Sequence, residues 1–228
     1  MKKVPITAII FDLDGTLMYY DKGIIEFLDK IVINTLEDMG FPVPNKDERV
    51  RLWRGKKSSN DVLRDWGIKD LGKFWKIFDD YQLPAIEKGI ETGEVKLYDD
   101  VIPVLDKLKN NGFVIGMMTN TPPEITKAKL KHLGIREYFS CVIAMGTERQ
   151  EYAKPHPYGI NECMQKLGVD KNDTAHVGDE LFDILAAKNA GCHSVLIDRE
   201  GIKSFEESPD FKIKSLYELF DIFTLKSK

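Results

Sequence analysis

Residues 9–17 read IIFDLDGTL, an apolar run that ends in two acids and a glycine. The apolar residues 8–11 are few, rich in Ile and followed by a Gly turn, which is typical of a strand buried in a parallel sheet. Asp12 and Asp14 stand at i and i+2, so along an extended chain both side chains point to one side. Open α/β sheets bind ligands at the carboxyl ends of their strands. Two carboxylates there are suited to holding a hard cation and attacking an anionic group.

The composition indicates an ordinary soluble protein, because 43% of its 228 residues are hydrophobic and 31% are charged. This length allows either one sizeable core or a core domain with a smaller insert. The net charge of −4 disfavours a nucleic-acid partner. No run approaches the roughly 18 apolar residues of a membrane span, and the chain enters its first strand without room for a signal peptide. Three widely spaced cysteines (Cys141, Cys163 and Cys192) suit buried thiols, so we expect a cytoplasmic protein without a membrane partner.

Residues 18–94 are expected to form an all-helical domain inserted after the first strand. Apolar side chains recur at helical spacing in residues 24–39 and 73–90, and further helices are plausible at 46–53 and 59–66. The stretch at 73–90 is expected to be interrupted near Pro84, and no strand is expected between Leu17 and Val95. Such an insert is longer than a crossover between parallel strands requires, and it is placed to act as a lid.

Residues 1–17 and 95–228 are expected to form the core, a doubly wound parallel sheet with helices on both faces. Further strands are predicted at 113–118, 141–144, 175–177, 194–197 and 211–213. Helices are predicted at 101–110, 124–133, 158–167, 181–189 and 216–220. Short connections between these elements favour a Rossmann-like α/β fold.

Polar residues follow four of these predicted strands. They are Asp12 with Asp14, Thr119 with Asn120, Lys154 in the loop beyond its strand, and Asp179 with Asp183. Because consecutive parallel strands end at the same edge of a sheet, these groups can converge. Taken singly, each has a plain structural explanation, such as a helix cap, a solvated lysine or a first-turn acid favoured by the helix dipole.

The order and spacing of these residues resemble the four motifs of the haloacid dehalogenase-like (HAD) hydrolases over almost the whole chain. The first motif, Asp-x-Asp-x-Thr, matches residues 12–16, and the second, a Ser or Thr that ends an apolar strand, matches Thr119. The third, Lys-Pro-x-Pro, matches KPHP at 154–157. The fourth, Gly-Asp-x-x-x-Asp, matches GDELFD at 178–183.

The resemblance implies a Mg²⁺-dependent phosphatase. Asp12 would be the nucleophile that forms an aspartyl-phosphate. Mg²⁺ would bind the carboxylates of Asp12 and Asp179 and the backbone carbonyl of Asp14. Asp14 would protonate the leaving alkoxide and then activate the water that breaks the intermediate. Thr119 and Lys154 would bind the phosphoryl oxygens and stabilise charge in the transition state.

Further residues have supporting roles in this interpretation. The backbone N–H groups of Leu13 and Asn120 would reach the phosphate, and Asp183 would orient Lys154 or a metal-bound water. His176, inside a predicted strand, is expected to be packed beneath the site rather than to act as an acid or base. The neighbours of each lysine or acid favour its functional role over its structural explanation, because several acids beside a phosphate require a cation such as Lys154.

The insert resembles the helical cap of the phosphoglycolate phosphatase and β-phosphoglucomutase branch. Its cluster RLWRGKKSS at 51–59 contains Arg54 and Lys56, which are candidates to bind a second anionic group of a small phosphorylated metabolite. The plain alternative is a solvated basic surface. Many close relatives also carry an Asp-Ser pair after the first motif, whereas this chain has MYYD at 18–21.

Three other functions remain to be weighed. A phosphomutase shares the nucleophile and the acid but excludes water. A dehalogenase is disfavoured because a halide leaves without a proton, and Asp14 is present. A binding protein built on the same scaffold would be expected to have lost one of the residues Asp12, Asp14, Lys154 or Asp179.

Overall fold

The protein is described by a computed structural model that covers residues 3–53 and 59–226. The described residues separate into two compact units. Unit 1 comprises Met1–Tyr19 and Leu97–Lys228, and unit 2 comprises Tyr20–Lys96. The insert therefore leaves unit 1 shortly after the residues that carry the first motif.

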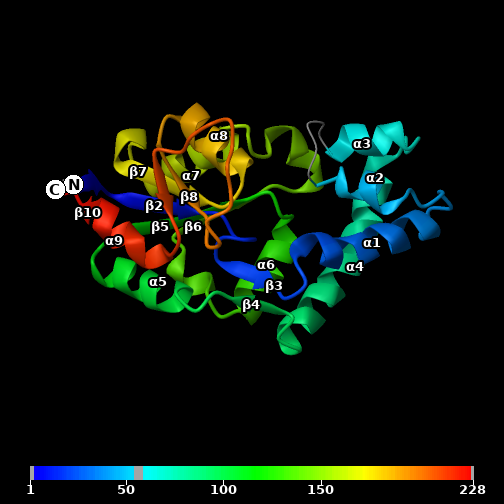
Figure 1. The fold of residues 1–228 in the computed structure, drawn as a ribbon, viewed down its shortest axis with the longest axis horizontal. Coiled ribbons are helices and arrows are strands. Elements are labelled where there is room, and N and C mark those ends of the chain that lie inside the picture. The colour runs from blue at the N-terminus through cyan, green and yellow to red at the C-terminus, as the bar shows by residue number, and fades with distance from the viewer. Residues whose placement is uncertain (1–2, 54–58, 227–228) are drawn as a thin grey trace. The chain divides into compact units, whose positions relative to one another are not determined.

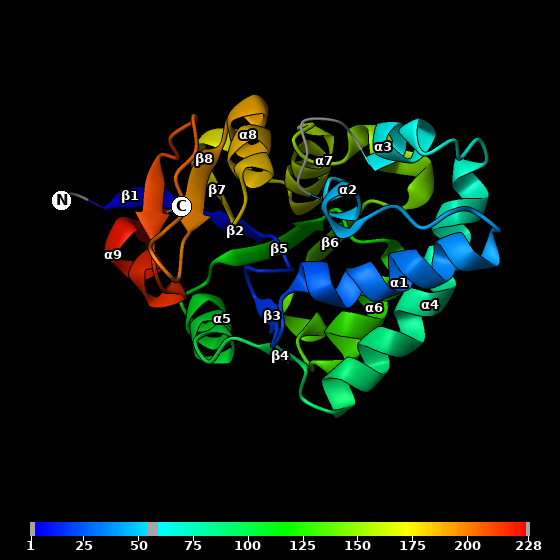
Figure 2. The same ribbon diagram turned by 45° about the vertical axis from the view of Figure 1, so that its right-hand side comes forward.

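Unit 1 is organised around a parallel sheet, which has six strands in the part of the chain that the structure describes. Its order is β6-β5-β2-β7-β8-β9, so β2 lies between β5 and β7 (Figure 2). The strands are β2 (Ala8–Phe11), β5 (Val114–Thr119), β6 (Cys141–Ala144), β7 (Thr174–Gly178), β8 (His193–Ile197) and β9 (Phe211–Ile213). All four residues of β2 are buried, as expected for a strand with helices on both of its faces.

The register brings the carboxyl ends of the central strands to one edge. Phe11 of β2 pairs with Met117 of β5 and with Val177 of β7. The residues that follow these three partners therefore emerge together. This arrangement confirms the predicted doubly wound α/β fold.

Helices cover both faces of the sheet. Helices α7 and α8 lie on one face, and α5, α6 and α9 lie on the other (Figure 1). The bounds are α5 (Val101–Asn110), α6 (Pro123–His132), α7 (Tyr158–Leu167), α8 (Leu181–Ala190) and α9 (Leu219–Ile222). Short 3₁₀ helices occur at Arg136–Tyr138, Thr147–Tyr152, Lys171–Asp173 and Leu216–Glu218.

Two small strand pairs were not anticipated from the sequence. Strand β1 (Val4–Ile6) pairs in parallel with β10 (Phe223–Leu225), near the two ends of the chain. Strand β3 (Met18–Tyr20) pairs with β4 (Val95–Leu97) where the insert begins and ends. The expectation of no strand between Leu17 and Val95 was therefore wrong for β3. Three residues are too short to show an alternating pattern, and only the pairing with β4 makes them a strand.

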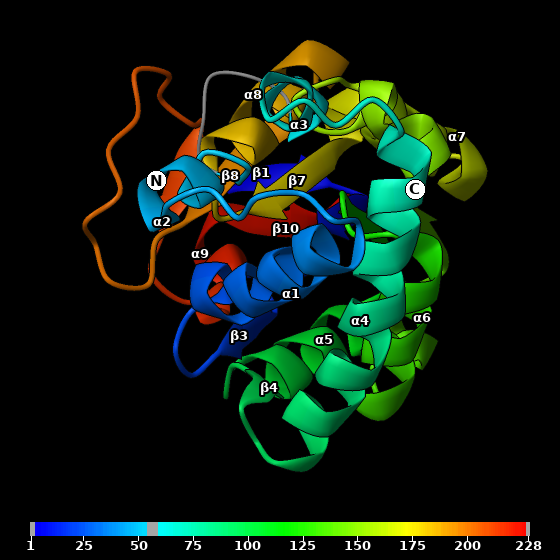
Figure 3. The ribbon, with the colours of Figure 1, turned by 90° about the vertical axis from the view of Figure 1, so that its right-hand side faces the viewer.

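Unit 2 is helical between these strands. Its helices are α1 (Ile24–Asp38), α2 (Lys46–Val50), α3 (Ser59–Asp65) and α4 (Leu71–Glu91), and α1 packs along α4 (Figure 3). Phe74, Trp75 and Phe78 form edge-to-face contacts in its core. Contrary to the expected interruption, α4 continues through Pro84. A proline removes one helical hydrogen bond, and the buried side chains on both sides of it hold α4 together.

No helix within residues 3–53 and 59–226 is long and apolar enough to cross a membrane. The basic residues Arg54 and Lys56 lie outside the described residues.

Candidate active site

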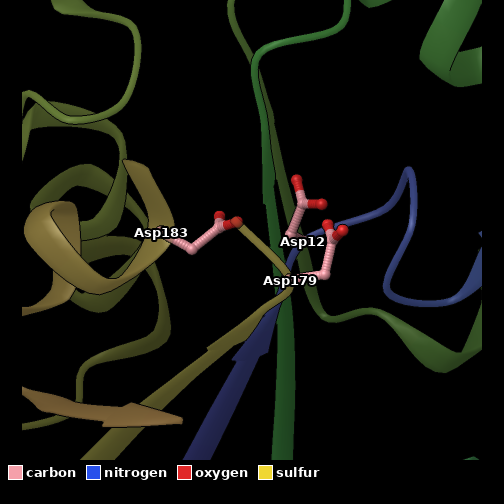
Figure 4. Close-up of side chains that lie close together, drawn as sticks. All are labelled: Asp12, Asp179 and Asp183. Carbon is pink, nitrogen blue, oxygen red and sulfur yellow. The ribbon is translucent and has the colours of Figure 1, made fainter. Parts of the chain in front are cut away.

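An acidic cluster forms where β2 and β7 end. Asp12 directly follows β2, and its N–H donates to the carbonyl of Val177 in β7 at 2.8 Å. Asp179 directly follows β7. Asp12, Asp179 and Asp183 each place a carboxylate oxygen within 4.8 Å of the others. Asp183 points toward the strand ends from the first turn of α8 (Figure 4).

Two glycines make room for these acids. Gly15 has a φ of +79°, and a Cβ built there would lie 2.6 Å from the Asp179 carboxylate. A Cβ on Gly178 would overlap the side chain of Asp183. The glycines of the first and fourth motifs are thus required by the close approach of the acids, and at Gly15 also by the left-handed backbone.

Lys154 lies between two of the acids. Its ammonium is buried and lies 2.5 Å from an oxygen of Asp12 and 2.5 Å from an oxygen of Asp183. Asn120 holds the Lys154 backbone from both sides, accepting its N–H at 2.8 Å and donating to its carbonyl at 3.2 Å. The Asn120 side chain therefore positions Lys154. Its backbone N–H remains a predicted phosphate donor.

Asp183 is held as an anion beneath Lys154. Besides Lys154, it accepts from His176 Nε2 at 3.1 Å and from the N–H of Glu180 at 3.0 Å. Burial opposes ionisation, but Lys154 and the hydrogen bond from His176 outweigh it and keep the pKa of Asp183 well below its usual range. Burial lowers the pKa of His176, so its ring is neutral and Nε2 carries the hydrogen. His176 is packed under the site, where the sequence analysis expected it.

The other two acids of the cluster lack full charge compensation. Burial raises the pKa of Asp12 to about 8, against the attraction of Lys154 and with repulsion from Asp183 and Asp179. Burial also raises the pKa of Asp179 to about 6, although Lys203 opposes the shift. The two lysines therefore do not supply enough positive charge to keep all three carboxyl groups ionised, and every potential ligand atom of the cluster is a carboxylate oxygen. Hard cations such as Mg²⁺ prefer oxygen ligands, so these residues fit one.

The Asp14 carboxylate lies outside this cluster. Lys129 Nζ is 2.7 and 2.9 Å from its two oxygens, and the hydroxyl of Thr121 donates to it at 2.7 Å. Asp14 is predicted to contact the metal through its backbone carbonyl. Its carboxylate therefore does not need to belong to the acidic cluster. Sequence analysis missed Lys129 and Thr121. One signal existed, because Lys129 is one turn beyond the buried Ile125 on the apolar face of α6.

A second lysine that the sequence analysis missed contacts Asp179. Lys203 Nζ lies 2.5 Å from the carboxylate and 2.5 Å from the backbone carbonyl of Asp179. It belongs to the loop after β8, where Asp198 accepts the N–H of Lys203 at 2.8 Å. No periodic pattern marks an irregular loop, so nothing in the sequence would have selected this lysine.

Two threonines complete the strand ends. Thr119 is the last residue of β5, is buried, and accepts the N–H of Thr121 through its hydroxyl oxygen at 3.1 Å. That bond does not use the hydroxyl hydrogen, which remains suited to donate to an anion. The buried Thr16 hydroxyl lies 3.4 Å from Asp12. The strand ends thus bring the four motifs together, whereas Arg54 and Lys56 lie outside the described residues.

Comparison with known proteins places this site in a family. The model of the haloacid dehalogenase-like hydrolases matches residues 6–191. A phosphoglycolate phosphatase of Photorhabdus laumondii is 34% identical over 197 residues, covering 83% of this chain and 79% of the relative. A phosphoglycolate phosphatase of Vibrio parahaemolyticus is 29% identical over the full length of both. The crystal structure of an HAD phosphatase from Thermococcus onnurineus, 29% identical, has a TM-score of 0.66 and covers 94% of this chain and 96% of its own.

The family model spans most of the chain, and the fold and the order of the motifs agree with it. This chain belongs to the haloacid dehalogenase-like hydrolases, on the branch of the phosphoglycolate phosphatases, and is a phosphatase of that family.

Proposed function

We propose that this phosphatase hydrolyses the monoester of a small phosphorylated metabolite through an aspartyl-phosphate on Asp12, with Mg²⁺ as its cofactor. The observation that carries the proposal is the buried Lys154 ammonium, 2.5 Å from both Asp12 and Asp183. A cation fixed beside a buried carboxylate lets an anionic phosphoryl group approach that carboxylate.

The acids at the strand ends support the choice of cofactor. Asp12 and Asp179 would hold Mg²⁺ with their carboxylates, and Asp14 would contribute its backbone carbonyl. The ion would screen the negative charges of nucleophile and phosphate from each other. Asp183 is engaged by Lys154, His176 and the helix N-terminus, so we assign it the role of holding Lys154 in place.

The chemical steps use only the chain's own groups and water. An oxygen of Asp12 attacks phosphorus, the P–O bond of the ester breaks, and Asp14 supplies a proton to the leaving oxygen. Water then attacks the phosphorus of the aspartyl-phosphate, Asp14 takes the proton back, and inorganic phosphate and free Asp12 are formed. Lys154 and the Thr119 hydroxyl bind the phosphoryl oxygens during both transfers.

The substrate class is a small phosphorylated metabolite. The relatives from Photorhabdus laumondii and Vibrio parahaemolyticus carry phosphoglycolate in their names, which makes it the first ester to test. We assign recognition of the leaving group to the inserted residues 18–94, including Arg54 and Lys56. We further propose a cytoplasmic location, in keeping with three cysteines that form no disulfide.

The test measures free phosphate released from phosphoglycolate, sugar phosphates, nucleotides and p-nitrophenyl phosphate, with Mg²⁺ or with EDTA. The variants are Asp12→Asn and, as a matched control, Asp221→Asn on the exposed side of α9. We expect release only with Mg²⁺, its loss in Asp12→Asn, and no change in Asp221→Asn. Phosphate release by Asp12→Asn would refute the assignment of Asp12 as the nucleophile. Phosphate release in EDTA would refute the assignment of Mg²⁺ as the cofactor. If phosphate moves between positions of a sugar and little free phosphate is released, the protein is a phosphomutase rather than a hydrolase.

A further inference from the structure

A buried lysine of unit 1 forms an ion pair with the Asp14 carboxylate. Lys129 is 1% exposed, and its ammonium lies 2.7 and 2.9 Å from the two oxygens of Asp14. We propose that Lys129 is a positioning residue that fixes the orientation of Asp14 for proton transfer to the leaving group. The proposal rests on the proposed function, because it assumes that Asp14 is the acid.

The burial of Lys129 requires such a partner. It extends from α6, whose buried face also carries Ile125, Thr126 and Leu130. Lysine is almost never fully buried unless it is paired, because an ammonium group loses its favourable hydration when it leaves water. An apolar residue at this position would pack without that cost. The pairing with Asp14 therefore offsets a penalty that the fold could otherwise have avoided.

A second donor fixes the same carboxylate. The Thr121 hydroxyl donates to Asp14 Oδ2 at 2.7 Å, and Lys129 contacts both oxygens. Thr121 also donates its N–H to the hydroxyl oxygen of Thr119. Contacts to both oxygens fix the carboxylate plane. Because Thr121 bonds to both Asp14 and Thr119, it also fixes the Asp14 carboxylate relative to the end of β5, where phosphate is proposed to bind.

Fixed orientation matters most when the leaving group needs a proton. An alkoxide leaves poorly unless it is protonated as the P–O bond breaks, whereas p-nitrophenolate is stable enough to leave unprotonated. The ratio kcat/KM includes the steps up to release of the first product, so it reports this protonation. Loss of Lys129 should therefore lower kcat/KM for an alkyl ester far more than for p-nitrophenyl phosphate.

The experiment compares Lys129→Met, Lys129→Arg and Asp14→Asn on phosphoglycolate and p-nitrophenyl phosphate. Lys131→Met is the matched control, an exposed lysine on the same helix. We expect Lys129→Met to lower kcat/KM for phosphoglycolate about 100-fold and for p-nitrophenyl phosphate less than about 10-fold, the scale of general acid catalysis. Lys129→Arg should recover most of the loss, and Lys131→Met should match the wild type.

Equal losses on the two esters would overturn the proposal, because a merely structural lysine would weaken both reactions alike. A double variant of Lys129→Met and Asp14→Asn should lose no more on phosphoglycolate than Asp14→Asn alone. Multiplied losses would show that the two residues act independently and would also refute the proposal.

A failure of the proposed function can be told apart from a failure of this inference. If the wild type releases no phosphate from any ester, the proposed function fails. The interaction between Lys129 and Asp14 is then tested by thermal unfolding. Each single variant should then lower Tm, because each removes one half of a largely buried ion pair, and the double variant should unfold above the temperature expected from their sum. Strictly additive shifts would overturn the pairing itself.

Discussion

Replacing Asp12 by Asn should make the metal-free protein more stable while abolishing its activity. In the unfolded chain the carboxyl of Asp12 is ionised from about pH 4 upward, near its ordinary pKa of 3.8. In the folded chain burial raises the pKa to about 8, so at pH 7 folding drives proton uptake by Asp12. Over about three pH units, at roughly 1.4 kcal/mol each, this costs roughly 4 kcal/mol of folding free energy.

Asparagine removes that cost but introduces a smaller one. Its buried amide lacks a full set of partners, at about 1–2 kcal/mol. The net gain should be about 2–3 kcal/mol, or a Tm higher by ~5–10 °C for a chain of this size. Lys154 keeps its ion pair with Asp183, so the variant leaves no cation unpaired.

The pH dependence gives the sharper check. A raised folded-state pKa means that protonation of Asp12 stabilises the wild type fully below about pH 4, and that this stabilisation is lost as pH rises through about 8. The stability gap between Asp12→Asn and the wild type should therefore be small at pH 4, widen up to pH 8 and then stay constant. Mg²⁺ should narrow the gap, because it binds the wild-type carboxylate better.

Urea unfolding in EDTA, followed by far-UV circular dichroism between pH 4 and 9, measures this gap. Tryptophan fluorescence alone would not suffice, because Trp53, Trp66 and Trp75 all lie in unit 2. Asp221→Asn serves as the control. A gap of the same size at pH 4 and pH 8, or a less stable Asp12→Asn, would show that Lys154 fully compensates Asp12 and would refute the reasoning.

Three further changes test other parts of unit 1. Lys154→Met should lower kcat by about 100- to 1,000-fold in steady-state phosphate release, because it removes a cation from the phosphoryl site; a loss below tenfold would contradict that role. Gly15→Ala should weaken Mg²⁺ binding, measured calorimetrically, because its Cβ would lie 2.6 Å from the Asp179 carboxylate; unchanged affinity would argue against Asp179 as a ligand. Arg199→Met should lower the free energy of unfolding by about 3–5 kcal/mol, measured in urea, since it removes the two-point ion pair with the largely buried Asp100; a change under about 1 kcal/mol would make that pair dispensable.

Local pattern was enough to predict most of the scaffold. The apolar residues 8–11, the Gly-terminated helices and the acids at strand ends are short-range features, and the parallel sheet follows from alternating strands and helices. Because parallel strands end at one edge, the convergence of Asp12, Thr119, Lys154 and Asp179 was also predictable. Strand β3 was not, since its three residues become a strand only by pairing with β4.

The sequence by itself determined the family, the sheet and the residues at the strand ends, because each motif, strand and helix is a pattern of residues close together in the chain, and the order of these patterns identifies the fold. Only the tertiary structure revealed that Lys129 meets Asp14 and that Lys203 meets Asp179, and it places Lys154 between Asp12 and Asp183. These partners lie 24 to 142 residues apart in sequence. Burial, which gives the ion pairs their strength and raises the pKa of Asp12, exists only once the helices have closed over the sheet.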